Sequence, residues 1–189
     1  ESICQIIPQF IFWAIYLKLT LEGIVMIIII TGLPGTGKTT IANALAKEID
    51  AVVFSTDKIR KKIFRNPVYN EEDKRIVYNE LFSQAEKYAK MGRNVILDGT
   101  FYTKALRNRA KEVGTLLSQK VYFVYCKTPE DILKKRIDNR KDKFSDADYN
   151  VYLEMKKIFE GFEEDIIEID TSNTVKTNID TIKLKIYSI

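Results

Sequence analysis

The sequence predicts an α/β fold in which helices cover both faces of a five-stranded parallel sheet. Strand and helix signals alternate along the chain from Met26 onward, as a parallel sheet with crossover helices requires. The first strand, Met26–Thr31, is an unbroken apolar run, which is typical of a strand buried on both faces. A glycine-rich loop and a helical pattern follow it directly. In such folds, ligands bind at the carboxyl ends of the strands.

The other expected elements follow in chain order, each from its own local signal. Apolar runs bounded by polar residues predict four further strands: Ala51–Ser55, Asn94–Asp98, Lys120–Cys126 and Ile166–Asp170. Apolar residues at helical spacing predict the helices, with Gly92 as a stop signal, Pro129 as a start signal and Ser145 as a cap. The expected helical ranges are Thr40–Glu48, Glu71–Met91, Thr103–Leu117, Pro129–Arg140, Asp146–Phe159 and Asn178–Tyr187.

Length and composition fit one ordinary globular domain, with 189 residues, 46% of them hydrophobic and 30% charged. The net charge of +4 suits an anionic substrate but does not by itself imply nucleic acid. The chain has no histidine, so any general base must be a carboxylate, a lysine or a tyrosine. Cys4 and Cys126 have no paired spacing, so we expect no disulfide framework or zinc site, and a cytoplasmic location.

The N-terminal segment is unusually apolar. Residues 3–19 contain a single charge, but a proline and two glutamines interrupt a run that is slightly shorter than the roughly 20 residues of a membrane span. We therefore expect residues 1–25 to be an extension outside the native protein and the functional domain to be 26–189. The alternative, if the extension is native, is a membrane anchor.

The loop after the first strand carries the most specific motif. Gly32–Thr39 matches the phosphate-binding pattern G-x-x-x-x-G-K-[ST] at every fixed position, in the strand–loop–helix context that the motif requires. Its backbone N–H groups would cradle a nucleoside triphosphate, with Lys38 on the β- and γ-phosphates and the Thr39 hydroxyl on Mg²⁺. No N-K-x-D-like motif is present, which favours ATP over GTP. The expected nucleotide ligands are Gly32, Pro34, Gly35, Thr36, Gly37, Lys38, Thr39 and Thr40.

Two acidic residues stand at the carboxyl ends of neighbouring strands. Asp98 ends an apolar strand, which is the layout of a Walker B carboxylate that holds Mg²⁺ together with Thr39; a turn cap is the alternative. Asp57 follows the second strand, and Arg60 lies one turn further on the same helical face. A carboxylate in this place can accept the proton of an attacking hydroxyl, while Arg60 binds an anionic group of the acceptor. The alternative for Asp57 is a helix N-cap.

Basic and aromatic residues elsewhere allow two interpretations each. Arg136 and Arg140 lie one turn apart, where they would close over the triphosphate and stabilise transition-state charge; a solvated basic face is the alternative. Arg107 and Arg109 fit either an acceptor contact or an exposed position. Aromatic residues at helical spacing are typical of a core, with a role in an acceptor pocket as the alternative: Tyr78, Phe82 and Tyr88.

Taken together, these motifs resemble the small P-loop kinases, which include polynucleotide, seryl-tRNA, adenylylsulfate and gluconate kinases and zeta-toxin-like enzymes. The chain is most similar to predicted kinases labelled as AAA-family ATPases, in which three further elements recur. These are S-T-D-x-x-R at Ser55–Arg60, D-[AG]-T-F at Asp98–Phe101, and S-D-A-D-x-x-V-Y at Ser145–Tyr152. The likeness extends from Met26 to about Ser172.

The resemblance implies a nucleoside-kinase-like P-loop NTPase fold with an arginine-rich lid, and γ-phosphoryl transfer from ATP to a hydroxyl. It assigns Asp57 as the base, Arg60 as the acceptor clamp, Lys38 and Arg136 as charge stabilisers, and Thr39 with Asp98 as Mg²⁺ ligands. The acceptor stays open between a small molecule and a nucleic-acid end, with adenylylsulfate kinase and 5′-hydroxyl polynucleotide kinase as alternatives. An acceptor-free ATPase or nucleotide-dependent switch is the alternative from another class. No stable protein partner is indicated.

Overall fold

The computed structural model describes residues 25–65, 70–139 and 149–188, so Cys4, Arg140, Ser145 and almost all of the N-terminal extension lie outside the described residues. The described residues form a five-stranded sheet in the order β2-β3-β1-β4-β5, and every strand pair in it is parallel. The predicted sheet is therefore confirmed, although the fourth strand is one residue longer than predicted. The strands are β1 (Met26–Thr31), β2 (Ala51–Ser55), β3 (Asn94–Asp98), β4 (Lys120–Lys127) and β5 (Ile166–Asp170).

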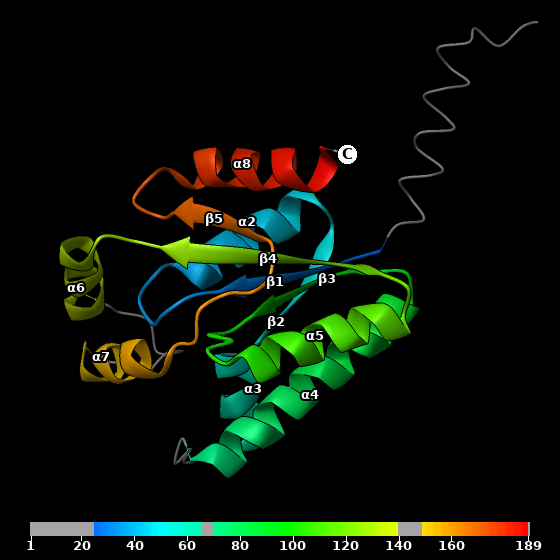
Figure 1. Ribbon diagram of the computed structural model, residues 1–189, viewed down its shortest axis with the longest axis horizontal. Coiled ribbons are helices and arrows are strands. Elements are labelled where there is room, and N and C mark those ends of the chain that lie inside the picture. Colours follow the sequence, from blue (N-terminus) through cyan, green and yellow to red (C-terminus); the bar gives the residue numbers. More distant parts are fainter. Residues whose placement is uncertain (1–24, 66–69, 140–148, 189) are drawn as a thin grey trace, which may run out of the picture.

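Helices cover both faces of the sheet (Figure 1). On one face lie α2 (Lys38–Glu48) and α8 (Val175–Tyr187); on the other lie α4 (Glu71–Lys90) and α5 (Lys104–Leu116). The short helix α3 (Thr56–Ile63) follows β2 and packs against α4. Past the carboxyl ends of β4 and β5 lie α6 (Glu130–Asp138) and α7 (Tyr149–Ile158).

Local capping explains where the helix boundaries differ from those predicted. The first helix begins at Lys38 rather than Thr40, because Gly37 adopts the left-handed conformation of a cap at φ 81°. The last helix begins three residues earlier than predicted, because the Thr174 side chain accepts a hydrogen bond from the Thr177 backbone N–H. Gly92, at φ 76°, follows the end of α4, as predicted.

The central strand β1 joins two apolar cores. Its alternate side chains point to opposite faces: Ile27 and Ile29 pack with α4 and α5, whereas Ile28 and Ile30 pack with α2 and α8. All four are 0% exposed, and each contributes roughly 1.5–3 kcal/mol through burial. Val25, which the sequence assigned to the extension, is buried in the core under α4.

This topology brings the carboxyl ends of all strands to one edge. Register pairs Ile30 of β1 and Ser55 of β2 with Asp98 of β3, so the loops after these strands begin side by side. None of the helices in the described ranges has the length and apolar character that a membrane crossing needs.

Candidate active site

The loop between β1 and α2 has a backbone shape that only glycines allow at its tightest points. Gly32 has φ 143°, and a Cβ there would lie 2.6 Å from the Cys126 carbonyl oxygen of β4. Gly35 has φ 84°, and a Cβ there would lie 3.0 Å from a side-chain carbon of Ile137 on α6. The close contacts show that the loop's main chain lies against β4 and α6, next to the N-terminus of α2. The backbone N–H groups at a helix N-terminus can bind an anion.

Two side chains at the end of the same loop bond back to its backbone. The Lys38 ammonium donates a hydrogen bond to the Leu33 carbonyl at 2.9 Å, so the side chain curls back across the loop. The Thr36 hydroxyl donates to the same carbonyl at 2.8 Å. Pro34 lies half-buried in the turn, and Thr40 is exposed on the first turn of α2. All the residues expected to bind phosphate therefore lie within one continuous loop and helix start.

Thr39 and Asp98 meet directly. The Thr39 hydroxyl donates to Asp98 Oδ2 at 2.7 Å, although the two residues are 59 positions apart. Asp98 is only 2% exposed, and burial raises the pKa of its carboxyl, against the effects of the Lys38 charge and of hydrogen bonds from Thr39 and Ser55. Among the described residues no group of three or more His, Cys, Asp or Glu side chains could hold a metal. The hydroxyl and carboxylate still fit Mg²⁺, which takes oxygen ligands and typically one or two carboxylates plus substrate phosphates.

The start of α3 lies beside the backbone of the same residue, Asp98. The Thr56 hydroxyl lies 3.5 Å from the Asp98 carbonyl oxygen, which ties the first residue of α3 to the end of β3. Ser55 occupies the N-cap position of α3, so the alternative role of Asp57 as the cap is wrong, and Asp57 lies in the first helical turn. Arg60 lies one turn further and is 6% exposed. A guanidinium this buried is a poor candidate for a solvated basic face.

Tyr78 on α4 lies within the electrostatic reach of both residues. Burial raises the pKa of its hydroxyl well above the usual value, the Arg60 charge lowers it and the Asp57 charge raises it. The hydroxyl accepts a hydrogen bond from the Phe101 backbone N–H at 3.1 Å, and the ring is packed in the core. Tyr78 thus serves the core, as its spacing predicted, and its hydroxyl also holds the backbone of the loop after β3.

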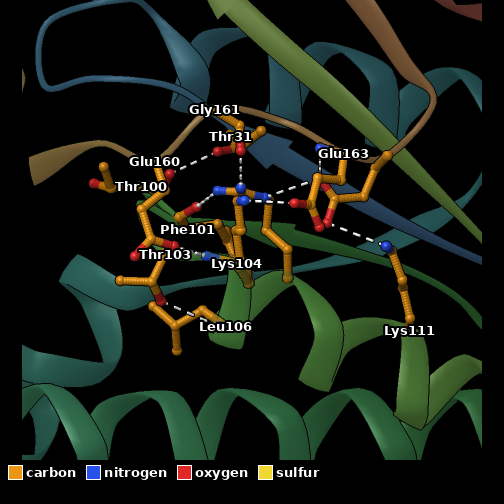
Figure 2. A network of polar contacts seen from close by, with 12 residues as sticks. Thr31, Thr100, Phe101, Thr103, Lys104, Leu106, Lys111, Glu160, Gly161 and Glu163 are labelled. Atoms are coloured by element: carbon orange, nitrogen blue, oxygen red, sulfur yellow. Dashed lines mark hydrogen bonds and ion pairs between the residues drawn. The ribbon is translucent and has the colours of Figure 1, made fainter.

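The loop after β3 is held by Arg107. Phe101 has φ 45°, and its carbonyl accepts a hydrogen bond from Arg107 Nη1 at 3.0 Å. Arg107 Nη2 donates to the Gly161 carbonyl at 2.6 Å, and Nε pairs with Glu164 at 3.1 Å. In the same loop, the Thr100 carbonyl accepts a hydrogen bond from the Thr31 hydroxyl at 2.6 Å (Figure 2).

The two expectations for Arg107, an acceptor contact or an exposed position, are therefore both wrong. Its side chain is 0% exposed, because the chain between α7 and β5 passes over it. Its guanidinium also lies 4.6 Å from the centre of the Phe162 ring. Arg109 is exposed and lies 5.5 Å from the Phe82 ring centre. Neither arginine needs a substrate to explain its position.

Arg136 of α6 lies beside the phosphate loop. Its guanidinium bonds the hydroxyl and the carbonyl of Thr171, the residue after β5, and Nη1 would be 3.6 Å from a Cβ on Gly37. The sequence patterns did not indicate Thr171, and they did not indicate the polar contacts of Arg107 and Tyr78 with the loop after β3. Local patterns carry no signal for such contacts, because each one joins segments that are distant in the sequence.

Comparisons with known proteins place the chain among relatives that include several kinases. Residues 27–162 match the model of a family described as an AAA domain. A Bacillus cereus shikimate kinase is 32% identical over 168 residues, which cover 84% of this chain and 97% of that protein. An L-seryl-tRNA(Sec) kinase of Methanococcus maripaludis is 27% identical over 175 residues, covering 87% of this chain and 66% of that protein. An uncharacterised Mycobacterium tuberculosis protein is 28% identical over 135 residues, and the match spans only 27% of its length.

Solved structures share the fold at low sequence identity. A putative kinase of Chloroflexus aurantiacus has a TM-score of 0.69 at 19% identity, covering 88% of this chain and 97% of that one. The Mycobacterium tuberculosis APS kinase, solved with AMPPNP and APS, has a TM-score of 0.64 at 17% identity, covering 86% and 97%.

Proposed function

Because this chain belongs to the AAA-domain family of small P-loop kinases, we propose that it transfers the γ-phosphate of ATP to a hydroxyl of a small anionic acceptor. One observation carries the proposal. The side chain of Asp98 bonds Thr39 of the phosphate loop, while its carbonyl lies beside Thr56 at the start of α3. The helix that carries Asp57 and Arg60 therefore begins where a triphosphate on the loop would end.

On the nucleotide side, the glycine-rich backbone would hold the phosphates, and Lys38 would swing from the Leu33 carbonyl to the β- and γ-phosphates. Thr39 and Asp98 would hold Mg²⁺, which supplies charge neutralisation of the phosphates when bound. Arg136 would add positive charge from α6. Arg140 is proposed to do the same, although it lies outside the described residues.

On the acceptor side, Asp57 would accept the proton of the attacking hydroxyl, and Arg60 would bind an anionic group of the same molecule. The planar guanidinium donates two parallel hydrogen bonds to a carboxylate, so a hydroxylated carboxylic acid is the acceptor that this pair suits best. The shikimate kinase relative, which matches over nearly its whole length, supports that class.

A nucleic-acid end is the second candidate acceptor. The support is the seryl-tRNA(Sec) kinase relative and the run of exposed basic side chains on and after α3, at Lys58, Lys62 and Arg65. These residues are exposed, whereas Arg60 is buried, one helical turn from the half-buried Asp57. The burial of Arg60 therefore favours the small acid.

The test is transfer of labelled γ-phosphate from ATP to a panel of acceptors: shikimate, gluconate, adenylylsulfate, seryl-tRNA and 5′-hydroxyl RNA. Asp57→Asn should bind ATP normally and lose transfer by about 10²–10⁴-fold. Asp180→Asn, on the exposed face of α8, is the matched control and should leave transfer unchanged. Label that appears only as free phosphate, equally in the wild type and in Asp57→Asn, would replace the kinase assignment with an acceptor-free ATPase.

A further inference from the structure

Thr171 joins three segments that meet at the phosphate loop. It follows β5, is 7% exposed, and its backbone N–H donates to the Lys127 carbonyl at the end of β4 at 2.8 Å. Its hydroxyl lies 2.8 Å from the Thr36 carbonyl oxygen of the loop and 3.1 Å from the Lys127 carbonyl oxygen. The single hydroxyl proton has its shorter contact with Thr36. Thr171 is therefore attached to the phosphate loop through its side chain and to β4 through its backbone.

The same residue accepts two hydrogen bonds from Arg136. Nη1 donates to the Thr171 hydroxyl oxygen at 2.9 Å, and Nη2 donates to its carbonyl oxygen at 2.7 Å. Nη1 also donates to the Thr128 hydroxyl at 3.3 Å. A guanidinium has five N–H donors. Among the contacts of the described residues, these bonds use three of the five, so the orientation of the group is set while donors are left for an anion.

The Arg136 guanidinium and the Thr171 hydroxyl both lie beside the start of α2. A Cβ on Gly37 would lie 3.5 Å from the Thr171 hydroxyl oxygen and 3.6 Å from Arg136 Nη1. Gly37 precedes Lys38, the first residue of α2, where backbone N–H groups and the helix dipole favour phosphate. Arg136 therefore lies beside the start of α2, where a phosphate would bind, and two of its three bonds there are to Thr171.

We propose that Thr171 is a positioning residue that orients Arg136 toward the terminal phosphate of the bound nucleotide. The inference rests on the proposed function, in which Arg136 stabilises charge on the triphosphate. The two bonds to Thr171 order the Arg136 side chain before the nucleotide binds. The entropy that a long side chain would otherwise lose on binding is therefore already lost in the free protein. The contribution should therefore appear in the preference for ATP over ADP, because only ATP carries the γ-phosphate.

The experiment measures equilibrium binding of ATP and ADP by calorimetry, in the presence of Mg²⁺ and without an acceptor. Thr171→Val keeps the shape of the side chain but removes the hydroxyl, and should lower the ATP-to-ADP affinity ratio about tenfold. Thr171→Ser should restore the ratio, since the hydroxyl returns. Thr181→Val, which removes an exposed hydroxyl on α8, is the matched control and should keep the wild-type ratio.

Coupling to Arg136 separates positioning from a merely structural role. Arg136→Ala should lower the same ratio, and adding Thr171→Val to it should lower the ratio no further. A ratio that stays within about twofold of wild type in Thr171→Val, or that falls equally with and without Arg136, overturns the inference. If Thr171→Val fails to fold, Arg136→Lys provides the test. A lysine ammonium cannot bond both Thr171 oxygens in the planar geometry of a guanidinium. A wild-type ATP-to-ADP affinity ratio in Arg136→Lys would therefore also overturn the inference. Because no acceptor is used, failure of the acceptor panel would leave this result standing.

Discussion

Arg107 and Glu164 form a buried ion pair that attaches the chain between α7 and β5 to helix α5. Their charged atoms are 3.1 Å apart, and the two side chains are 0% and 3% exposed. Lys111 also pairs with Glu164 at 3.1 Å, from a half-exposed position on the next turn of α5. The same guanidinium bonds the Phe101 carbonyl, so this pair also holds the loop that follows Asp98.

Replacing Arg107 by methionine should strongly destabilise the protein. The change leaves the Glu164 carboxylate buried with less compensation and frees the carbonyls of Phe101 and Gly161. We expect the free energy of unfolding in urea to fall by about 3–5 kcal/mol. Arg109→Met, on the exposed face of the same helix, is the control and should change it by less than about 1 kcal/mol. Equal changes in the free energy of unfolding for the two substitutions would show that the buried ion pair does not stabilise the protein.

The Glu164 pair should also make stability depend on pH. Burial acts to raise the pKa of Glu164, but backbone N–H groups and the charges of Lys111 and Arg107 outweigh it and hold the pKa below the usual value of 4.5. A depressed folded-state pKa means that the stabilisation is present above the unfolded-state value and is lost as the pH falls through the folded-state value. The stability difference between wild type and Glu164→Gln should therefore be largest near pH 7 and shrink toward pH 3, as followed by thermal melts. A gap that widens toward acid would contradict the assignment.

Substitution of Asp98 should change the need for magnesium more than the binding of nucleotide. Asp98→Asn keeps an oxygen for the Thr39 hydroxyl but removes the charge that would attract the metal. We expect the Mg²⁺ concentration for half-maximal transfer to rise about 10–100-fold. Titration of activity with Mg²⁺ at saturating ATP measures this, with Asp180→Asn as the control. An unchanged midpoint in Asp98→Asn would remove Asp98 from the metal site.

Two glycine-to-alanine changes should separate the cost of backbone strain alone from the effect of a steric clash in the phosphate loop. Gly92 has φ 76° and open space around it, so Gly92→Ala should cost about 1–2 kcal/mol of stability and leave ATP binding intact. Gly32→Ala would place a methyl group 2.6 Å from the Cys126 carbonyl oxygen, so the phosphate loop must move. Melting temperatures and calorimetric ATP titrations of the two variants test this. Similar ATP affinities for both would show that the loop tolerates the displacement.

The chain's local patterns were sufficient for the fold class and for the position of the glycine-rich loop between β1 and α2. A strand buried on both faces must be apolar throughout, and β1 is. A loop that wraps phosphate needs glycine at fixed spacing, and a helix needs a cap or a stop within a few residues of its end. Such requirements involve neighbours in sequence, so the five strands and the glycine-rich loop can be predicted from the sequence alone.

Only the tertiary structure determined which polar side chains form hydrogen bonds and ion pairs with one another. Arg107 was indistinguishable from Arg109 in the sequence, because the Glu164 that buries it lies 57 positions away. Thr171 had no motif, yet its hydroxyl reaches Thr36 across 135 positions. The free energy of a buried hydrogen bond depends on which partner the tertiary fold places beside the residue. The residue's neighbours in sequence do not specify that partner.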